Sequence, residues 1–233
     1  MALFSAAGIQ FLLRWLHFLS GITWIGLLYY FNFVQGPFFA EADASTRSVA
    51  TQKLVPRALW WFRWSAMVTF LSGLTILILR RASWSDPWGI TILTGAAFGT
   101  VMFVNVWRVI WPNQRTVIAN AVATAGGKAA NPAAAGAARR AFLASRTNVV
   151  MSFPMLFFMG AASHFTLNPA GNRGLYGVLL LVVLALLELN ALVGTAGPTK
   201  KPIETVRGVI VTGIVTAAVM YLIAQAVLGT PAT

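Results

Sequence analysis

Long apolar runs constrain the fold of this chain more than any other feature of its sequence. Six stretches each hold roughly 20 mostly apolar residues, the length that an α-helix needs to cross a bilayer. Only 9% of the residues are charged, whereas a soluble domain carries about 25%. We predict an all-α integral membrane protein, a single domain over residues 1–233 built as a bundle of about six transmembrane helices. The predicted spans are residues 8–33, 57–79, 88–111, 147–167, 174–193 and 205–228.

Proline-containing turns are expected to end two of these helices. The motif QGPF, with Pro37, is predicted to end the first span, and WPNQ, with Pro112, the third. Residues 113–145 then form an Ala/Gly-rich basic connection, predicted to be cytoplasmic. Its end, NPAAAGAARRAFLASR, begins with an Asn cap and a proline, which is typical of a helix start. It predicts either a short basic helix at the membrane surface or a low-complexity linker.

The basic residues are distributed unevenly between the two ends of the predicted bundle. The net charge of +12 favours basic membrane loops beside a lipid bilayer over nucleic-acid binding. Four basic residues fall on one side, namely Arg14, Arg80, Arg81 and Arg173. Thirteen fall in or beside the three other connections, namely Arg47, Lys53, Arg57, Arg63, Arg108, Arg115, Lys128, Arg139, Arg140, Arg146, Lys200, Lys201 and Arg207. The positive-inside rule therefore predicts a multi-pass protein of the bacterial inner membrane with both termini on the periplasmic side.

Two histidines, His17 and His164, lie in predicted spans and are the only ones in the chain. Their distances from the helix ends place both in the outer leaflet, on antiparallel helices. The chain has no cysteine, which excludes disulfides, thiolate metal sites and covalent c-type haem. We therefore expect haem b ligated by His17 and His164. The alternatives are a copper or other metal site, or histidines that only pack and form hydrogen bonds.

The neighbours of the two histidines follow one pattern. Gly21 and Gly160 each lie one helical turn from a histidine on the cytoplasmic side, which would leave a bare patch for a flat macrocycle. Trp24 could form a wall one turn further in. Arg14, one turn towards the outside, could pair with a haem propionate.

Other polar residues gather towards the cytoplasmic ends of the spans. Glu188 is the only acid placed deep in a span, so it must be protonated or paired, with arginines as candidate partners. For the arginines, the sequence favours snorkelling side chains and one structural ion pair. The alternative is a pocket for a small anion or polar ring, or a proton path, and the role of Glu188 stays open between the two. The candidate residues are Arg63, Asn105, Arg108, Asn113, Arg146, Asn148 and Glu188.

Four motifs resemble the membrane domain of bacterial cytochrome-c-linked urate oxidases, also called urate hydroxylases. They are LHFLSGITWIGLLYYFNF, WWFRWSAMVTFLSGLTIL, VNVWRVIWPNQ and RTNVVMSFPMLFFMGAASHF, which occur in the family's order over most of residues 10–168. The resemblance fades after Gly174. The positions that match the family motifs are His17, Trp24, Gly26, Asn105, Pro112, Asn113, Gln114, Asn148, Pro154 and His164.

The resemblance implies a membrane redox protein that passes electrons from a purine to a c-type cytochrome. Family members carry a C-terminal cytochrome c domain, whereas this sequence ends at Thr233 without a cysteine, and Arg146 stands where the family often has histidine. We therefore expect a haem b-binding electron-transfer subunit that works with a cytochrome or a larger membrane complex. The alternatives are a urate-oxidising enzyme that needs a separate cytochrome c, and a cofactor-free structural subunit of a respiratory or photosynthetic complex.

Overall fold

The computed structural model describes residues 2–230 and is helical throughout, with no strand among these residues. Six helical segments are long and apolar enough to cross a membrane: Ala6–Glu41, Val55–Leu79, Pro87–Ala125, Ala134–His164, Arg173–Leu192 and Val206–Leu228. The elements are η1 (Ala2–Phe4), α1 (Ala6–Tyr29), η2 (Tyr30–Gln35), α2 (Gly36–Glu41), α3 (Ala44–Lys53), α4 (Val55–Leu79), α5 (Pro87–Asn105), η3 (Val106–Ile110), α6 (Trp111–Ala125), α7 (Ala134–His164), α8 (Arg173–Leu192), η4 (Pro198–Lys200), α9 (Lys201–Glu204) and α10 (Val206–Leu228).

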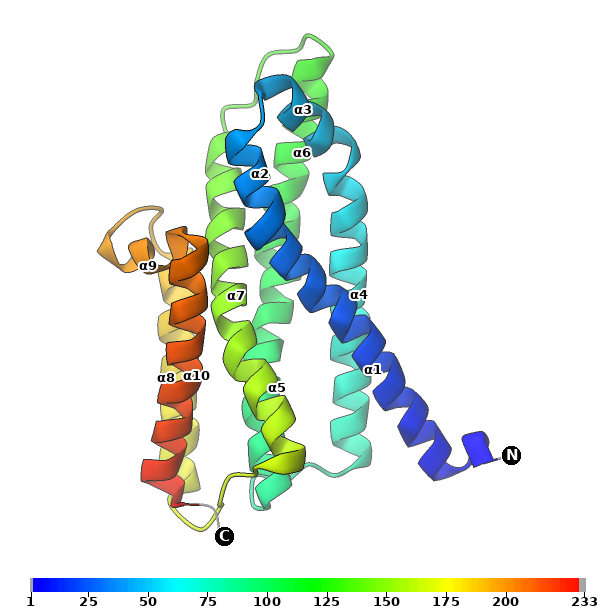
Figure 1. Ribbon diagram of the computed structural model, residues 1–233, viewed down its shortest axis with the longest axis vertical. Helices are drawn as coiled ribbons and strands as arrows, with labels where there is room; N and C mark the ends of the chain where they lie inside the picture. Colours follow the sequence, from blue (N-terminus) through cyan, green and yellow to red (C-terminus); the bar gives the residue numbers. More distant parts are fainter. Residues whose placement is uncertain (1, 231–233) are drawn as a thin grey trace.

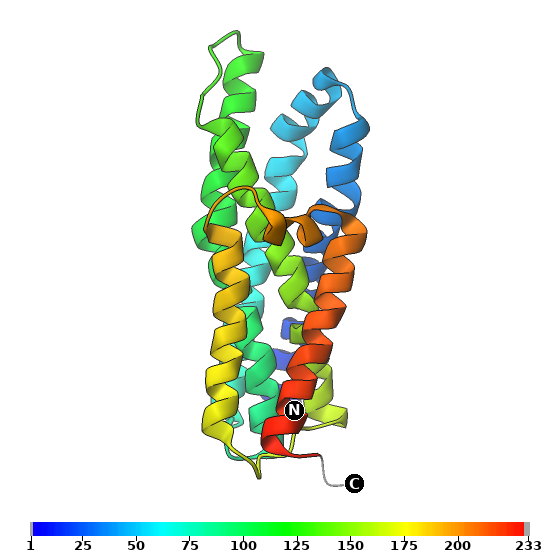
Figure 2. The ribbon, with the colours of Figure 1, turned by 90° about the vertical axis from the view of Figure 1, so that its left-hand side faces the viewer.

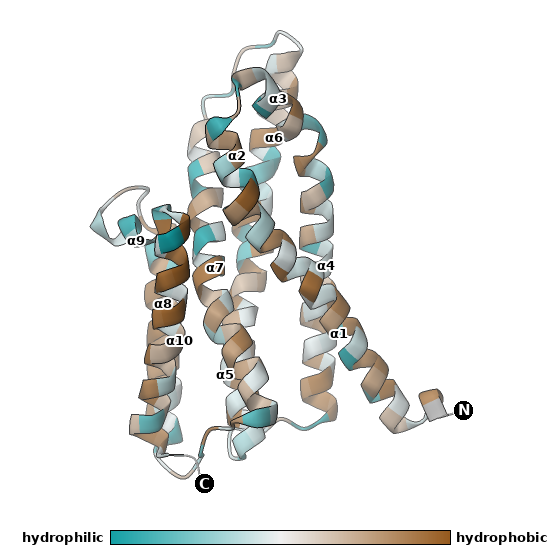
Figure 3. Cartoon of the chain, viewed as in Figure 1, coloured by the Kyte–Doolittle hydropathy of each residue, from teal (hydrophilic) through white to brown (hydrophobic). Residues whose placement is uncertain are grey.

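Helix α7 forms the centre of the bundle. It packs against α5, α6, α8 and α10. Of the residues in its most apolar stretch 67% are buried, whereas the corresponding share is 22% in α8 and in α10. Helices α8 and α10 lie side by side on one flank of α7 (Figures 1 and 2). Helix α1 packs along α4 and crosses the bundle obliquely, so that its first turns diverge from the end of α7 (Figure 1). Apolar residues cover α8 and α10, whereas the η4–α9 connection is more polar (Figure 3).

Two helices continue through prolines that were predicted to end them. A proline ring collides with the carbonyl four residues earlier in an α-helix. Before each proline the chain instead widens into a π-helix, η2 before Pro37 and η3 before Pro112. The N–H of Gly36 donates to Phe31 O, and that of Trp111 donates to Val106 O, five residues back in each case. The wider turn accommodates the ring, so the predicted helix ends at QGPF and WPNQ are wrong.

The predicted connection over residues 113–145 is mostly helical. Helix α6 runs to Ala125, and α7 begins at Ala134 and continues unbroken through Pro154 to His164. The predicted short surface helix is therefore the first turns of α7. Only residues 126–133 form a turn, in which Gly127 has a φ of +79° and Asn131 Oδ1 accepts a hydrogen bond from the Ala133 N–H. Alanine, the best helix former, makes up much of the segment that α7 gains.

The other predicted spans agree with the structure to within a few residues. Residues 57–79, 174–193 and 205–228 correspond to α4, α8 and α10. The first turns of α1 and the last turns of α10 lie at the same end of the bundle (Figure 1), as an even number of crossings requires. Helices α3 and α6 lie at the opposite end, which we call the basic end because Arg47, Lys53 and Arg115 lie there. The predicted side of the membrane for each end stays a prediction.

Candidate functional site: a polar girdle around α7

A ring of buried and half-buried polar residues, most of them hydrogen-bonded to one another, surrounds α7 near the π-helices. It consists of Ser145, Arg146, Asn148 and Ser152 on α7 together with Tyr29, Asn32, Asn105 and Glu188 on neighbouring helices, and we call it the α7 polar girdle. Arg146 is 5% exposed, Asn105 is 1% exposed, and Asn148 and Ser152 are fully buried. Burying so many polar groups is costly unless they find partners, so their contacts are informative.

Three predicted residues meet on one side of the girdle. The Asn105 amide nitrogen lies 2.9 Å from both Asn148 Oδ1 and Glu188 Oε2, and donates to each. The Asn148 amide in turn donates to Met102 O over 3.0 Å. Glu188 thus obtains its partner from an asparagine, and none of the arginines proposed as its partners forms an ion pair with it among residues 2–230. Of the two possibilities for Glu188, protonated or paired, pairing with one of the candidate arginines is therefore not seen among these residues.

The other side of the girdle was not predicted. Tyr29 and Ser152 hydroxyl oxygens lie 2.9 Å apart, and the Asn32 amide donates to Ser145 Oγ and Leu28 O over 2.8 Å each. Asn32 lies inside the π-helix η2, and Asn105 is the residue directly before the π-helix η3. Each π-helix therefore comes with a buried asparagine that bonds to α7. The signal in the sequence is an asparagine shortly before a proline within an apolar run.

Arg146 is the member of the girdle that lacks partners. Its Nε and Nη1 atoms are buried and form no hydrogen bond with any described residue. The Phe142 ring, one turn earlier on α7, lies 5.1 Å from the guanidinium carbon. No carboxylate among residues 2–230 forms an ion pair with it. A buried, unpaired guanidinium costs several kcal/mol, on the order of the whole stability of many proteins. Such a group suits an anionic ligand that accepts two parallel hydrogen bonds.

The remaining predicted residues of this cluster lie apart from the girdle contacts. Arg63 stacks on Trp111, with its guanidinium carbon 3.9 Å from the ring centroid. Asn113 donates to Val109 O and accepts a hydrogen bond from Arg140 Nε. Arg108 is exposed. The structure therefore brings together Asn105, Asn148 and Glu188 and leaves the other members of the predicted cluster outside these hydrogen bonds.

His17 faces α4. Its Nδ1 atom lies 2.9 Å from Thr69 O and 3.1 Å from Ser72 Oγ. The ring packs so closely on Gly73 that a Cβ there would lie 2.9 Å from His17 Cε1. An imidazole that donates Nδ1–H to a carbonyl presents Nε2 as a lone-pair donor, which is the arrangement usual for haem and metal ligands. His17 by itself therefore fits an axial ligand.

The rest of the predicted haem site fits less well. His164 is exposed at the end of α7 and forms no hydrogen bond with the described residues. A Cβ at Gly160 would meet no atom within 4 Å, so the helix surface is bare there. Gly21 faces Thr69 of α4, so it does not leave a gap for a macrocycle. Trp24 is buried, with an unpaired Nε1. The first turns of α1 diverge from the end of α7 (Figure 1), and a haem shared by His17 and His164 stays a prediction.

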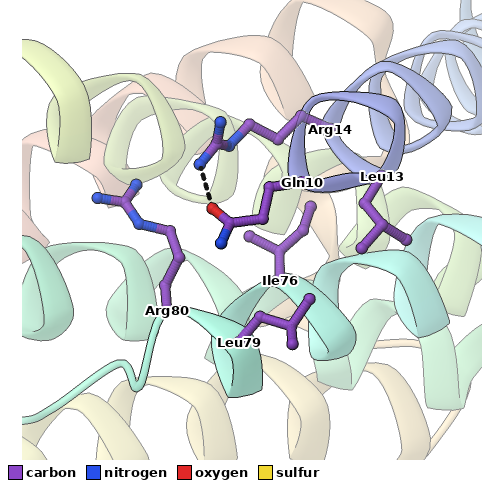
Figure 4. Close-up of a pocket in the computed structure, with 6 residues that line it drawn as sticks. All are labelled: Gln10, Leu13, Arg14, Ile76, Leu79 and Arg80. Carbon is purple, nitrogen blue, oxygen red and sulfur yellow. Dashed lines mark hydrogen bonds between the residues drawn. The ribbon is translucent and has the colours of Figure 1, made fainter. Parts of the chain in front are cut away.

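Arg14 lies in a shallow recess between α1 and α4. Its Nη2 donates to Gln10 Oε1 over 3.4 Å, and Arg80 lines the same recess (Figure 4). The Arg80 guanidinium also stacks on Trp88 at 4.0 Å from the ring centroid. Arg14 is therefore bonded within its own helix, and its pairing with a propionate stays a prediction.

Comparison with known proteins supports the resemblance seen in the motifs. A family model described as "Urate oxidase N-terminal" matches residues 84–224, which is more than half of the chain. The comparison found no curated protein and no solved structure that matches this chain. The match starts just before α5 and includes α7, α8 and most of α10, whereas the motif resemblance covered residues 10–168 and faded after Gly174. It therefore includes Asn105, Arg146, Asn148 and Glu188 of the girdle, and the chain belongs to the urate oxidase N-terminal family.

Proposed function

We propose that this chain is a multi-pass subunit of a bacterial inner membrane and binds urate or a related planar purine anion at Arg146. The observation that carries the proposal is the buried guanidinium with Nε and Nη1 unpartnered. The family to which the chain belongs is named for urate oxidation, which supplies the substrate class. A planar anion with adjacent oxygen and nitrogen acceptors matches the fork of donors that arginine presents.

Oxidation of the purine must release electrons, for which we propose a c-type cytochrome or a larger membrane complex as the acceptor. The chain's own part is to bind and orient the purine. Arg146 supplies the charge, and Phe142 supplies an aromatic face 5.1 Å from the guanidinium carbon. The fixed asparagines and Ser152 hold α7 in register with its neighbours, so the arginine is held in place before the ligand arrives.

The binding proposal can be tested without an electron acceptor. Isothermal titration of the full chain in lipid nanodiscs with urate should show binding that Arg146→Gln weakens by at least about tenfold, since a charge-assisted pair of hydrogen bonds is lost. Arg140→Gln is the matched control, because Arg140 lies on the same helix and is exposed. Equal urate affinity in Arg146→Gln and the parent protein would refute the proposed site.

Turnover provides the second part of the test. With urate and oxidised cytochrome c present, the parent protein should reduce the cytochrome and Arg146→Gln should reduce it far more slowly. Binding without cytochrome reduction would keep the site but assign the oxidation to another subunit.

Haem-mediated electron transfer is a second candidate function, favoured by the arrangement of His17. Its Nδ1 is held by Thr69 O while Nε2 is left for a ligand. A reduced-minus-oxidised spectrum of the purified protein should then show haem b bands that His17→Ala removes. A colourless, folded preparation would leave His17 as a hydrogen-bonding residue between α1 and α4.

A further inference from the structure

A second group of arginines without acidic partners lies between α4 and α6, away from the girdle. Arg63 of α4 stacks on Trp111, and its guanidinium carbon is 5.7 Å from the Trp64 ring centroid and 5.8 Å from that of Trp107. Its Nε atom is buried and lacks a hydrogen-bond partner among the described residues. Three tryptophans thus hold one cation in a fixed position, as cation–π contacts do.

A second positive charge lies on the same tryptophan. Arg115 lies one helical turn after Trp111 on α6, and its guanidinium carbon is 5.9 Å from the Trp111 ring centroid. Neither arginine forms an ion pair with a carboxylate among residues 2–230. Two like charges beside one ring repel each other, and an anion between or beside them relieves this repulsion. The arrangement therefore calls for an anionic ligand that the described part of the chain does not supply.

The surroundings of this pair point to the kind of anion. Trp60, Trp61 and Trp64 are 48%, 60% and 41% exposed and lie on the same stretch of α4 as Arg63. Exposed tryptophans gather where lipid tails meet headgroups. Arg63 is eight residues after the start of α4 at the basic end, or roughly 12 Å along the helix. At a membrane interface the phosphate group of a lipid is the anion that is supplied in abundance.

We propose that Arg63, Arg115 and Trp111 bind the phosphate group of an anionic membrane lipid at the basic end of the bundle. The arginines contact the phosphate, and the exposed tryptophans of α4 lie beside the glycerol and upper tail regions. The site is separate from Arg146, so it does not depend on the proposed purine binding. Free inorganic phosphate offers the same chemistry, and the experiment must distinguish it from lipid.

The test counts lipids that stay bound to the full chain. The protein is purified in mixed micelles with equal amounts of phosphatidylglycerol and phosphatidylcholine, and retained lipid is measured by native mass spectrometry. We expect the parent protein to retain phosphatidylglycerol selectively. Each of Arg63→Gln and Arg115→Gln should lower its affinity about fivefold, and the double variant about 30-fold, since one arginine near lipid phosphate contributes about 1 kcal/mol.

Two further variants make the result specific. Arg57→Gln removes the same charge from an exposed position of α4, where the arginine forms no cation–π contact with a ring of the described residues. It should leave phosphatidylglycerol retention within twofold of the parent. Trp111→Leu keeps both arginines but removes the ring that holds them, and it should weaken retention severalfold. Circular dichroism checks that each variant is folded. An equal loss in Arg57→Gln, or no preference for phosphatidylglycerol in the parent, would overturn the proposal.

Competition separates the lipid from other anions. Inorganic phosphate at millimolar concentration should leave phosphatidylglycerol bound, because the lipid is also held by its tails. Displacement by inorganic phosphate would make the site one for a free anion and refute the lipid. Displacement by urate would assign Arg63 and Arg115 to the substrate instead, and it would leave the Arg146 test unaffected.

Discussion

The two halves of the bundle differ in how the polar residues of their spanning helices are partnered. At the girdle, Asn105 and Asn148 bond to each other across two helices, and Asn105 also reaches Glu188 on a third. In the other half, His17 bonds only to α4, and His164 has no hydrogen-bond partner in the described part of the chain. Polar residues in apolar surroundings hold helices together where they meet and remain available for other partners where they do not.

Asn148→Leu should break the girdle and give the largest loss of stability. The side chain is fully buried, and its removal leaves the Asn105 amide with Glu188 as its remaining partner. Met102 O loses the Asn148 donor and then accepts only from the Val106 N–H. We expect the free energy of unfolding to fall by about 3 kcal/mol, measured by detergent titration in mixed micelles. Asn113→Leu is the control, because that amide is only partly buried, and it should cost less than about 1 kcal/mol. Equal losses would show that cross-helix bonding gives the girdle no special stability.

Gly95 and Gly160 allow a comparison between a glycine packed against a neighbouring helix and one with no neighbour. A Cβ at Gly95 would lie 3.0 Å from Met155 O and 3.2 Å from Met159 N, both backbone atoms of α7. Gly95→Ala should therefore push α5 away from α7 and cost about 2 kcal/mol in the same titration. A Cβ at Gly160 meets nothing within 4 Å, so Gly160→Ala should not lower stability and should raise it by up to about 1 kcal/mol, since alanine is the better helix former. Destabilisation by Gly160→Ala would show that this glycine faces a bound partner or a second copy.

Replacing each histidine should change the stability less, and it tests the half of the bundle away from the girdle. His17→Ala removes bonds to Thr69 O and Ser72 and should cost about 1 kcal/mol. His164→Ala removes no hydrogen bond within the described chain and should have no measurable effect on the protein without cofactor. If both substitutions destabilise the protein equally, the two histidines share a ligand or contact, and the contrast between the two halves would disappear.

The sequence predicted the helices well where apolar length decides the outcome, as for α4, α8 and α10. It failed at Pro37 and Pro112, because the rule that proline ends a helix assumes α-helical geometry and a π-helical turn removes the clash. Depth along a helix is also readable from sequence, which is why both histidines were placed at a similar level. The rotation of a helix about its axis and its tilt in the bundle cannot be read from the sequence. In the structure α1 runs obliquely along α4, and His17 faces α4.

Because the sequence gives the depth of a residue in a helix but not the direction it faces, only some girdle residues could be predicted. Asn105, Asn148 and Glu188 are polar residues in apolar spans at a similar depth, so they were grouped correctly. Tyr29 and Asn32 lie in a run where the apolar residues dominate, and only the π-helix η2 turns Asn32 towards α7. That Arg146 lacks a partner depends on side-chain contacts from several helices, which a sequence does not contain.

The Asp43 side chain makes more hydrogen bonds than that of any one girdle asparagine, but it is exposed, and it should show the smallest effect. Its carboxylate caps α3 by accepting from the Thr46 hydroxyl and from the Ser45 and Thr46 N–H groups. These bonds, led by the Thr46 hydroxyl, hold the pKa of the exposed carboxyl below its ordinary value. The stabilisation is therefore present above the ordinary pKa of aspartate and is lost as the pH falls through the lowered value.

Hydrogen exchange of the α3 amides should report this loss. Their protection should fall on acidification in the parent protein, because a protonated carboxyl is a weaker acceptor for the cap. Asp43→Asn keeps a neutral cap, so its α3 amides should be slightly less protected at neutral pH and should lose the pH dependence over this range. The girdle amides around Asn148 should stay protected throughout, because no water replaces their partners. A parallel loss of protection at the girdle and at α3 would mean that the cap and the bundle unfold as one unit.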